Sequence, residues 1–279
     1  MTTVPVHQLG EADRGAVERL LDRDPFGTAH VAERVAASGL TWWRAEGRML
    51  GYGARHDPEA LCWLGGHLTP VLASRSAVAA FAERLAAEER LCSSMVGRAD
   101  AVLDLWERLS PSWGPARIVR PNQPLLVTDV PPQVNIDPEV RLVRRDEIDL
   151  LFPAAVRMYT EEVGLSPLTE DGGRGYRSRV AGLVRAQRAY ARFIEGRVAF
   201  KAELAVVTRH TAQVQGVWVD PEWRGQGLAT AAMATVMRDA LERVAPTVSL
   251  YVNDFNTPAR RVYERCGFRQ VGTLATVLF

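Results

Sequence analysis

Two spacings of hydrophobic residues alternate along this chain and predict a mixed α/β protein. Apolar residues three and four positions apart mark helices, as in residues 76–89, where Ala77, Phe81 and Leu85 share one face. Short runs rich in valine and aromatic residues, bounded by glycine, proline or aspartate, mark strands. The predicted class is therefore α+β, with helices on a mostly antiparallel sheet.

The first half of the chain predicts a strand, two helices, three strands, a helix, a strand, a helix and extended segments. In order, the ranges are 4–9; 10–21 and 28–37; 40–44, 49–55 and 60–68; 76–89; 92–96; 99–109; 117–119 and 124–127.

The second half predicts a similar order of elements. A strand at 140–143 precedes a helix at 147–159, with Asp146 as its N-cap. A glycine-containing loop at 168–179 is expected to be mobile, and residues 180–187 are weakly helical. The remaining predicted elements are strands at 190–195, 197–208 and 213–219, a helix to 243, a strand at 248–253, a helix at 257–266 and one or two strands at 268–279.

A stretch with two adjacent prolines, residues 130–140, separates these halves and favours a linker. We therefore expect an N-terminal domain over residues 1–130 and a C-terminal domain over 140–279. The shared element order favours two copies of one architecture.

Composition excludes several classes of function. The chain of 279 residues has a formal net charge of +1, which gives no electrostatic reason to expect nucleic acid as a partner. The basic residues are arginines except for one lysine, Lys201. The three cysteines, Cys62, Cys92 and Cys266, are scattered, which argues against disulfides and a cysteine zinc site.

The chain also lacks the patterns of membrane and secreted proteins. Its N-terminus has no basic region followed by an apolar core, so we expect no signal peptide. No apolar run reaches the roughly 18 residues that suggest a membrane span. A cytoplasmic location is expected.

One stretch, residues 214–243, carries the clearest chemical signal. It predicts a strand (VQGVWV), a tight loop (DPEWRGQGLA) and a long helix. Gly225 and Gly227 lie where the helix begins, and unpaired amides at a helix start bind phosphate well. One alternative is an ordinary tight connection between a strand and a helix. Another is a dinucleotide-binding turn, but that motif needs an acidic residue at the end of the next strand, and this strand ends in Asn253. A Walker loop is excluded because no Gly-Lys-Ser/Thr follows.

The segment RGQGLA resembles the acyl-CoA signature of the Gcn5-related N-acetyltransferase (GNAT) superfamily, [Q/R]-x-x-G-x-[G/A]. A second segment, LYVNDFNTPARRVYERCGF, is similar to that family's strand–Asn–helix–Tyr–x–x–x–Gly–Phe region. The resemblance covers about residues 140–279. It implies a GNAT fold with a splayed sheet, in which strand 248–253 diverges from the strand before the loop.

The resemblance also implies acetyl-CoA or another acyl-CoA as co-substrate, an amine acceptor, and no metal. Loop amides and Arg224 are expected to hold the pyrophosphate, and the strand before the loop to pair with the pantetheine arm. The implied acyl-CoA-binding residues are Val217, Trp218, Val219, Arg224, Gly225, Gln226, Gly227, Leu228, Ala229, Thr230 and Asn256.

Tyr263 corresponds to the tyrosine with which the family protonates the departing thiolate. The alternative is a core tyrosine that packs beside Phe268. Asn256 is equally suited to cap a helix, and Arg260 and Arg261 are either ligands of an outer phosphate or surface residues.

A general base is harder to find. Many family members have a glutamate on the strand before the loop, where this chain has Gln213 and Gln215. Glu203 is the predicted base. The other candidates are Glu161, Glu162, a water chain and His210.

The N-terminal half resembles an uncharacterised domain fused ahead of GNAT domains. After residues 60–68 it lacks the glycine pair, so we expect it to have lost acyl-CoA binding. Its tryptophans, Trp42, Trp43, Trp63, Trp106 and Trp113, are expected in the core, with a binding surface as the alternative. Two functions follow: an acyltransferase, or an acyl-CoA-binding regulator with a degenerate acceptor site.

Overall fold

The computed structural model describes residues 6–40, 47–169 and 171–279. The chain forms two compact units. The first contains Met1–Leu126, Tyr251–Phe255 and Gln270–Phe279, and the second contains Val127–Leu250 and Asn256–Arg269. Two segments from the end of the chain thus belong to the first unit, whereas the predicted limits of 1–130 and 140–279 assign them to the second domain.

The first unit is a sheet covered by helices. Its elements are β1 (Val6–Leu9), α1 (Arg14–Asp22), α2 (Ala29–Ser38), β2 (Arg48–Ala54), β3 (Asp57–Leu64), β4 (His67–Val71), α3 (Arg75–Ala86), β5 (Ser94–Arg98), α4 (Ala99–Trp113), most of β6 (Ile118–Thr128) and most of β12 (Arg269–Leu278). Strands β1 to β4 pair antiparallel in sequence order, β4 pairs parallel with β5, and β12 pairs antiparallel with β5.

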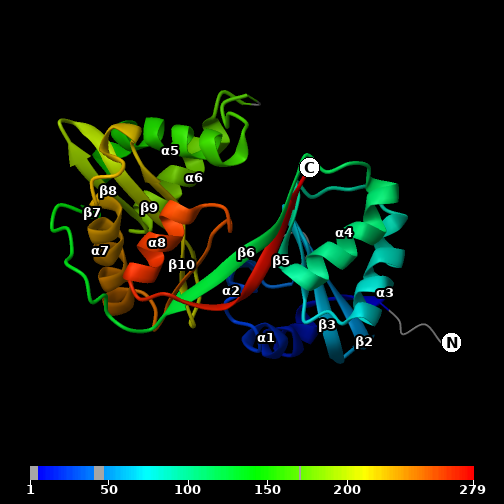
Figure 1. Ribbon diagram of the computed structural model, residues 1–279. Coiled ribbons are helices and arrows are strands. Elements are labelled where there is room, and N and C mark those ends of the chain that lie inside the picture. The colour runs from blue at the N-terminus through cyan, green and yellow to red at the C-terminus, as the bar shows by residue number, and fades with distance from the viewer. Residues whose placement is uncertain (1–5, 41–46, 170) are drawn as a thin grey trace. The chain divides into compact units, whose positions relative to one another are not determined.

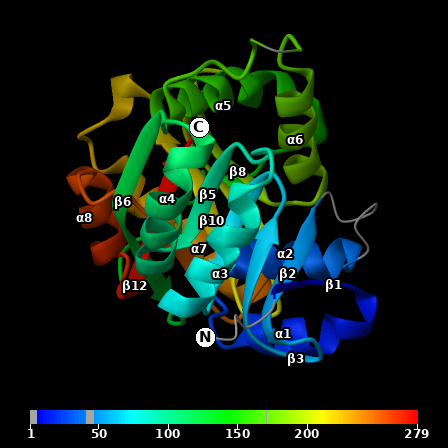
Figure 2. The same ribbon diagram turned by 90° about the vertical axis from the view of Figure 1, so that its right-hand side faces the viewer.

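Alternating side chains of this sheet enter two cores. Leu50 and Cys62 face α3 and α4, and the neighbouring Met49 and Leu61 face α1 and α2. Figure 2 shows the two helix pairs on opposite sides of β2 and β3. This period-two alternation is what a strand buried on both faces produces.

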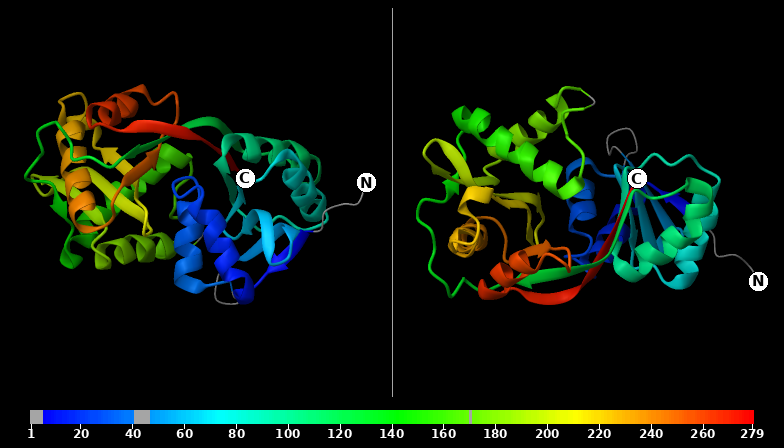
Figure 3. Two further views of the ribbon diagram at one scale, coloured as in Figure 1. Left: turned by 90° about the horizontal axis from the view of Figure 1, so that it is seen from below. Right: turned by 45° about the horizontal axis from the view of Figure 1, so that its top comes forward.

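The second unit is a smaller sheet with the same layering. Its elements are β7 (Arg141–Leu142), α5 (Ile148–Val163), α6 (Arg174–Arg185), β8 (Ala189–Ile194), β9 (Arg197–Val207), β10 (Ala212–Val219), α7 (Leu228–Arg243), most of β11 (Val248–Tyr251) and α8 (Thr257–Arg265). Strands β7 to β10 pair antiparallel in order, and β10 pairs parallel with β11. Helices α5 and α7 lie on opposite sides of β8 to β10 (Figure 3).

Three local predictions are wrong. The strand expected at 60–68 is two strands, because the chain turns at Gly65 and Gly66. Asp146 is not a helix N-cap: it lies inside a 3₁₀ turn, Arg145–Glu147, and it is the carboxylate of Glu147 that accepts the Arg144 N–H at 2.9 Å.

The third error concerns the loop expected at 168–179. Helix α6 begins at Arg174, so only the first half of that range is irregular. The carboxylate of Asp171 accepts hydrogen bonds from the amides of Gly173 and Gly175 at 2.8 and 2.7 Å and so stabilises the helix start. The three glycines of this segment are typical of a loop, which is why the sequence predicted one.

Other differences are smaller. The extended segments at 117–119 and 124–127 are one strand, β6, and the closing segment is one strand, β12. The strand expected at 40–44 lies outside the described residues except for Leu40, as do Trp42 and Trp43. None of the helices in the described ranges is both long and apolar enough to cross a membrane.

Candidate active site

A glycine loop connects β10 to α7 in the second unit (Figure 1). Gly225 has φ +75° and Gly227 has φ +82°, a region that other residues rarely adopt. Apart from its chain neighbours, no described residue has a heavy atom within 4 Å of a Cβ atom added at either glycine. The backbone conformation therefore requires glycine, and the space beside the loop is open.

The start of α7 has no capping side chain. Gly227 is its N-cap and supplies no side-chain acceptor, and Thr230 N–H reaches only the Gly227 carbonyl, at 3.3 Å. The corresponding helix of the first unit, α3, is capped by Ser74, whose Oγ accepts the Ala77 amide at 3.3 Å. The glycine-capped end leaves first-turn amides for an anion, whereas the serine-capped end satisfies one internally.

Two long side chains of the loop fold back on the protein. Arg224 donates from Nε to the Val219 carbonyl and from its terminal nitrogen to Glu161, both at 2.8 Å. Gln226 donates to the Glu222 carbonyl at 2.9 Å. These bonds fix the loop, and the half-exposed Arg224 guanidinium keeps a positive charge beside it.

Strands β10 and β11 separate after their first residues. The register between them contains two pairs, Ala212 with Val248 and Gln213 with Ser249. The second half of β10 thus has β9 on one side and an unpaired edge on the other. An unpaired edge is what an extended, amide-containing ligand needs for strand-like pairing.

The strand itself is irregular at its centre. The register with β9 shifts between Gln215 and Trp218, and Gly216 has φ +57°. Beyond the shift, Asp220 N–H donates to the Ala199 carbonyl of β9. Because strand amides alternate in direction, the N–H of Val219 faces the open edge.

The side chain of Trp218 lies elsewhere. It is buried among residues of α5, α6 and β8, and its Nε1 donates to Glu161 at 3.1 Å. Of the three strand residues predicted to bind acyl-CoA, only Val217 and Val219 have partly exposed side chains, so Trp218 can contribute only its backbone.

Helix α8 packs against the first turn of α7, where the Cys266 thiol donates to the Thr230 carbonyl at 3.6 Å (Figure 1). Tyr263 on α8 is buried, and its ring meets Phe268 edge to face with centroids 5.8 Å apart. Its hydroxyl forms no hydrogen bond within the described part of the chain. Burial, with further contributions from Glu162 and Cys266, raises the pKa of Tyr263, so the phenol is protonated at neutral pH.

Asn256 caps α8, since its Oδ1 accepts the Ala259 amide at 3.3 Å. The adjacent Arg260 and Arg261 are exposed. Both alternatives for these residues stay open.

Glu203 on β9 sits in a buried ion-pair network. Its carboxylate lies 2.8 Å from Lys201 Nζ and accepts from Arg179 of α6 at 3.1 Å. Burial alone raises the pKa of Glu203, but Lys201 and Arg179 outweigh it and the pKa is lowered. A carboxylate with a lowered pKa binds a proton weakly, so its role as general base stays a prediction that this environment disfavours.

The other base candidates are no better placed. Glu161 is already bonded to Trp218 and Arg224. His210 lies in the turn before β10, at the opposite end of that strand from the glycine loop. Glu162 is exposed, and its charge acts on Tyr263.

Sequence reasoning missed Lys201 and Arg179. Nothing in the pattern around them suggests a buried network, although a single lysine among so many arginines was a signal. No group of three or more His, Cys, Asp or Glu residues suited to a metal ion occurs in the described ranges.

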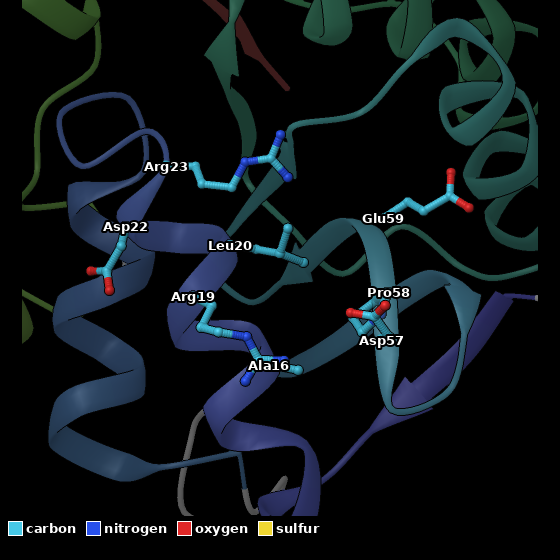
Figure 4. Close-up of a pocket in the computed structure, with 8 residues that line it drawn as sticks. All are labelled: Ala16, Arg19, Leu20, Asp22, Arg23, Asp57, Pro58 and Glu59. Carbon is cyan, nitrogen blue, oxygen red and sulfur yellow. The ribbon is translucent and has the colours of Figure 1, made fainter.

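A cavity also lies elsewhere, in the first unit. It measures about 640 Å³ and is formed by α1, the residue that follows it and the start of β3, with lining residues such as Arg19, Arg23 and Asp57 (Figure 4). It contains none of the loop, strand or helix residues described above.

Comparison with known proteins gives two family matches. Residues 152–268 match the Acetyltransferase (GNAT) family, and residues 47–151 match a domain of unknown function, DUF4081. The glycine loop, β10 and Tyr263 all lie within the first of these matches, which confirms the GNAT resemblance.

Relatives agree with this assignment. A mycothiol acetyltransferase of Acidothermus cellulolyticus is 46% identical over 55 residues, which are 20% of this chain and 17% of that protein. Among solved structures, a GNAT-family acetyltransferase from Colwellia psychrerythraea superposes with a TM-score of 0.61 at 12% identity, covering 99% of both chains. A tandem GNAT protein from the clavulanic acid biosynthesis pathway gives a TM-score of 0.55 at 13% identity, covering 98% of both. These similarities confirm the predicted fold of two GNAT-like parts.

Proposed function

Since residues 152–268 match the Acetyltransferase (GNAT) family, we propose that the chain transfers an acyl group from acyl-CoA to an amine. The relative named above is an acetyltransferase, which supports acetyl as the group transferred. The observation that carries the proposal is the open, uncapped glycine loop at the start of α7.

This loop suits a pyrophosphate. The amides around Gly225, Gly227 and Leu228 are the donors, Arg224 adds positive charge, and the Thr230 hydroxyl is a further donor. Since the described residues beyond the chain neighbours leave the space beside the two glycines open, phosphate oxygens can approach the backbone directly.

The open edge of β10 suits the rest of the molecule. Val219 N–H faces this edge and can pair with an amide of the pantetheine arm. A β10 amide nearer the bulge polarises the acyl carbonyl when the amine attacks.

Tyr263 serves the departing sulfur. Acyl-CoA supplies the activated thioester, and the amine forms a C–N bond as the C–S bond breaks. The sulfur leaves with a proton from the phenol, and the proton that the amine nitrogen loses returns to the phenolate through solvent. The raised pKa keeps that proton on Tyr263 until it is needed, and its hydroxyl is not committed to another described residue.

A second function has its own support. Gln213 and Gln215 occupy the positions on β10 where a carboxylate base is expected, and the nearby Glu203 is ion-paired. These features favour an acyl-CoA-binding regulator that transfers slowly or not at all.

Release of free thiol separates the two functions. Acetyl-CoA is mixed with the protein and a panel of small primary amines, and thiol is followed with a colorimetric reagent. The transferase predicts amine-dependent release. Binding of acetyl-CoA without release by any amine favours the regulator.

A further inference from the structure

Lys201 is the one lysine of the chain, and it is fully buried. Its Nζ donates to the Gly216 carbonyl at 2.8 Å and forms the 2.8 Å ion pair with Glu203. Burying an ammonium group costs several kcal/mol unless it is paired, so such a residue needs an explanation.

The carbonyl that it binds belongs to the β10 bulge. The register gives residues 216 and 217 no partner on β9, because Gln215 pairs with Glu203 and Trp218 with Lys201. A Cβ atom at Gly216 lies only 3.0 Å from Lys201 Nζ and 3.2 Å from Met158. Glycine is therefore required here by its φ of +57° and by the close approach of Lys201.

In a trans peptide the carbonyl oxygen and the following N–H point in opposite directions. Holding the Gly216 carbonyl toward Lys201 consequently holds the Val217 N–H away from it. We propose that Lys201 is a positioning residue: it fixes the 216–217 peptide so that the Val217 amide donates to the acyl carbonyl of acyl-CoA. This inference rests on the proposed function and assigns the polarising amide to one residue.

The network around Lys201 supports a fixed orientation. Arg179 donates to the other oxygen of the Glu203 carboxylate and fixes its position. The Lys201 ammonium, which pairs with that carboxylate, is therefore fixed as well. A compact ammonium with three donors suits a site this close to a backbone, whereas a guanidinium is a wider planar group. This explains why a lysine stands here in a chain that otherwise uses arginine.

The sequence permits a direct test, because Gly216–Val217 is the only Gly-Val pair in the chain. The full chain labelled with carbonyl-¹³C glycine and ¹⁵N valine gives a single cross-peak in an HNCO spectrum, that of the Val217 amide. The position of this peak is compared between the complexes with acetyl-CoA and with free CoA, because only acetyl-CoA has the acyl carbonyl. We expect acetyl-CoA to move the proton of this peak downfield relative to CoA.

In Lys201→Met the peak should shift in the free protein, and the difference between acetyl-CoA and CoA should vanish. Acetyl-CoA should still raise the melting temperature, since the glycine loop is intact. The matched control is Arg192→Met, which breaks another ion pair to a buried carboxylate, Asp137, without touching β10. It should leave the Val217 response unchanged.

A double variant separates positioning from stability. Lys201→Met combined with Glu203→Gln removes both charges. The double variant should lose less stability than either single variant, because each single variant leaves one buried charge without its partner. The Val217 response should stay absent, and turnover with any active amine should stay about 100-fold low. A normal Val217 response in Lys201→Met, or turnover that recovers with stability, overturns the inference. If acetyl-CoA neither shifts the wild-type peak nor raises its melting temperature, the proposed function itself fails.

Discussion

Tyr263 has features that suit both alternatives offered by the sequence, core packing and proton donation. Its ring packs on Phe268, and its hydroxyl is left without a partner in the described residues. A buried tyrosine used only for packing usually finds a hydrogen-bond partner, as Tyr190 does with Asp239. The free hydroxyl therefore favours chemistry over packing alone.

Tyr263→Phe should lower the rate of thiol release by about 100-fold, because general acid catalysis is worth at least that much. Acetyl-CoA affinity should be unchanged, since the ring remains. The control is Tyr190→Phe, which removes another buried hydroxyl of the same unit. An unchanged rate in Tyr263→Phe would exclude the residue from the mechanism.

Glu203 also makes the free energy of unfolding depend on pH. Its folded pKa is lowered, so its ion pairs contribute stability above the unfolded pKa of about 4.3 and lose it as the pH falls below that value. Glu203→Gln leaves Lys201 without its charge partner.

We expect Glu203→Gln to cost about 3 kcal/mol of unfolding free energy at pH 7. Urea unfolding at pH 7 and pH 4 measures it, and the gap between wild type and variant should narrow at the lower pH. Equal stabilities at pH 7 would contradict the ion-pair account.

At the scale of elements, the strand–loop–helix from β10 to α7 was predictable, because glycines at a helix start and valines before it are local signals. The bulge at Gly216 was not. It depends on Lys201 and Met158, which approach from β9 and α5, and no short-range pattern reports such contacts. The start of α6 was missed for a different reason: the Asp171 carboxylate that accepts its first amides lies among glycines, which are typical of a loop.

Gly227→Ala tests the loop as an element. The added methyl at φ +82° costs about 1 kcal/mol of strain and occupies the open space where a phosphate is proposed to lie. Gly196→Ala is its control, at φ +73° in the β8–β9 turn and equally open.

Both variants should lose similar stability in urea unfolding. Only Gly227→Ala should lose acetyl-CoA affinity, by at least about 10-fold in calorimetric titration, as expected when direct backbone contact is blocked. Equal affinities in the two variants would place the ligand elsewhere.

For the whole molecule, two parts of similar architecture were predictable from repeated element order, but the path of the chain end was not. Strand β12 follows the GNAT motif in sequence, yet residues 94–98 pair with it in the first unit, and Ala275 and Val277 enter that unit's core. Pairing of such distant segments leaves no mark in local periodicity.

Deletion of residues 270–279 should therefore damage the first unit. Strand β5 loses its antiparallel partner and Phe279 leaves the rings of Trp106 and Trp113. Hydrogen exchange should show that the backbone amides of residues 94–98 lose protection, whereas the amides of α5 remain protected. Loss confined to α5 and its neighbours would contradict the assignment of β12. Phe255→Ala, at a phenylalanine that is 73% exposed, is the control and should change neither.

We propose that acyl-CoA binds at the glycine loop of α7. Thermal unfolding with and without acetyl-CoA tests it most directly, in the wild type and in Gly227→Ala. Ligand at about 100 times its Kd should stabilise the wild type by about 2.7 kcal/mol, and the same concentration should stabilise the variant by no more than about 1.4 kcal/mol, since its affinity is at least about 10-fold lower. No stabilisation of the wild type by acetyl-CoA or longer acyl-CoAs, or equal stabilisation of both proteins, would contradict the claim.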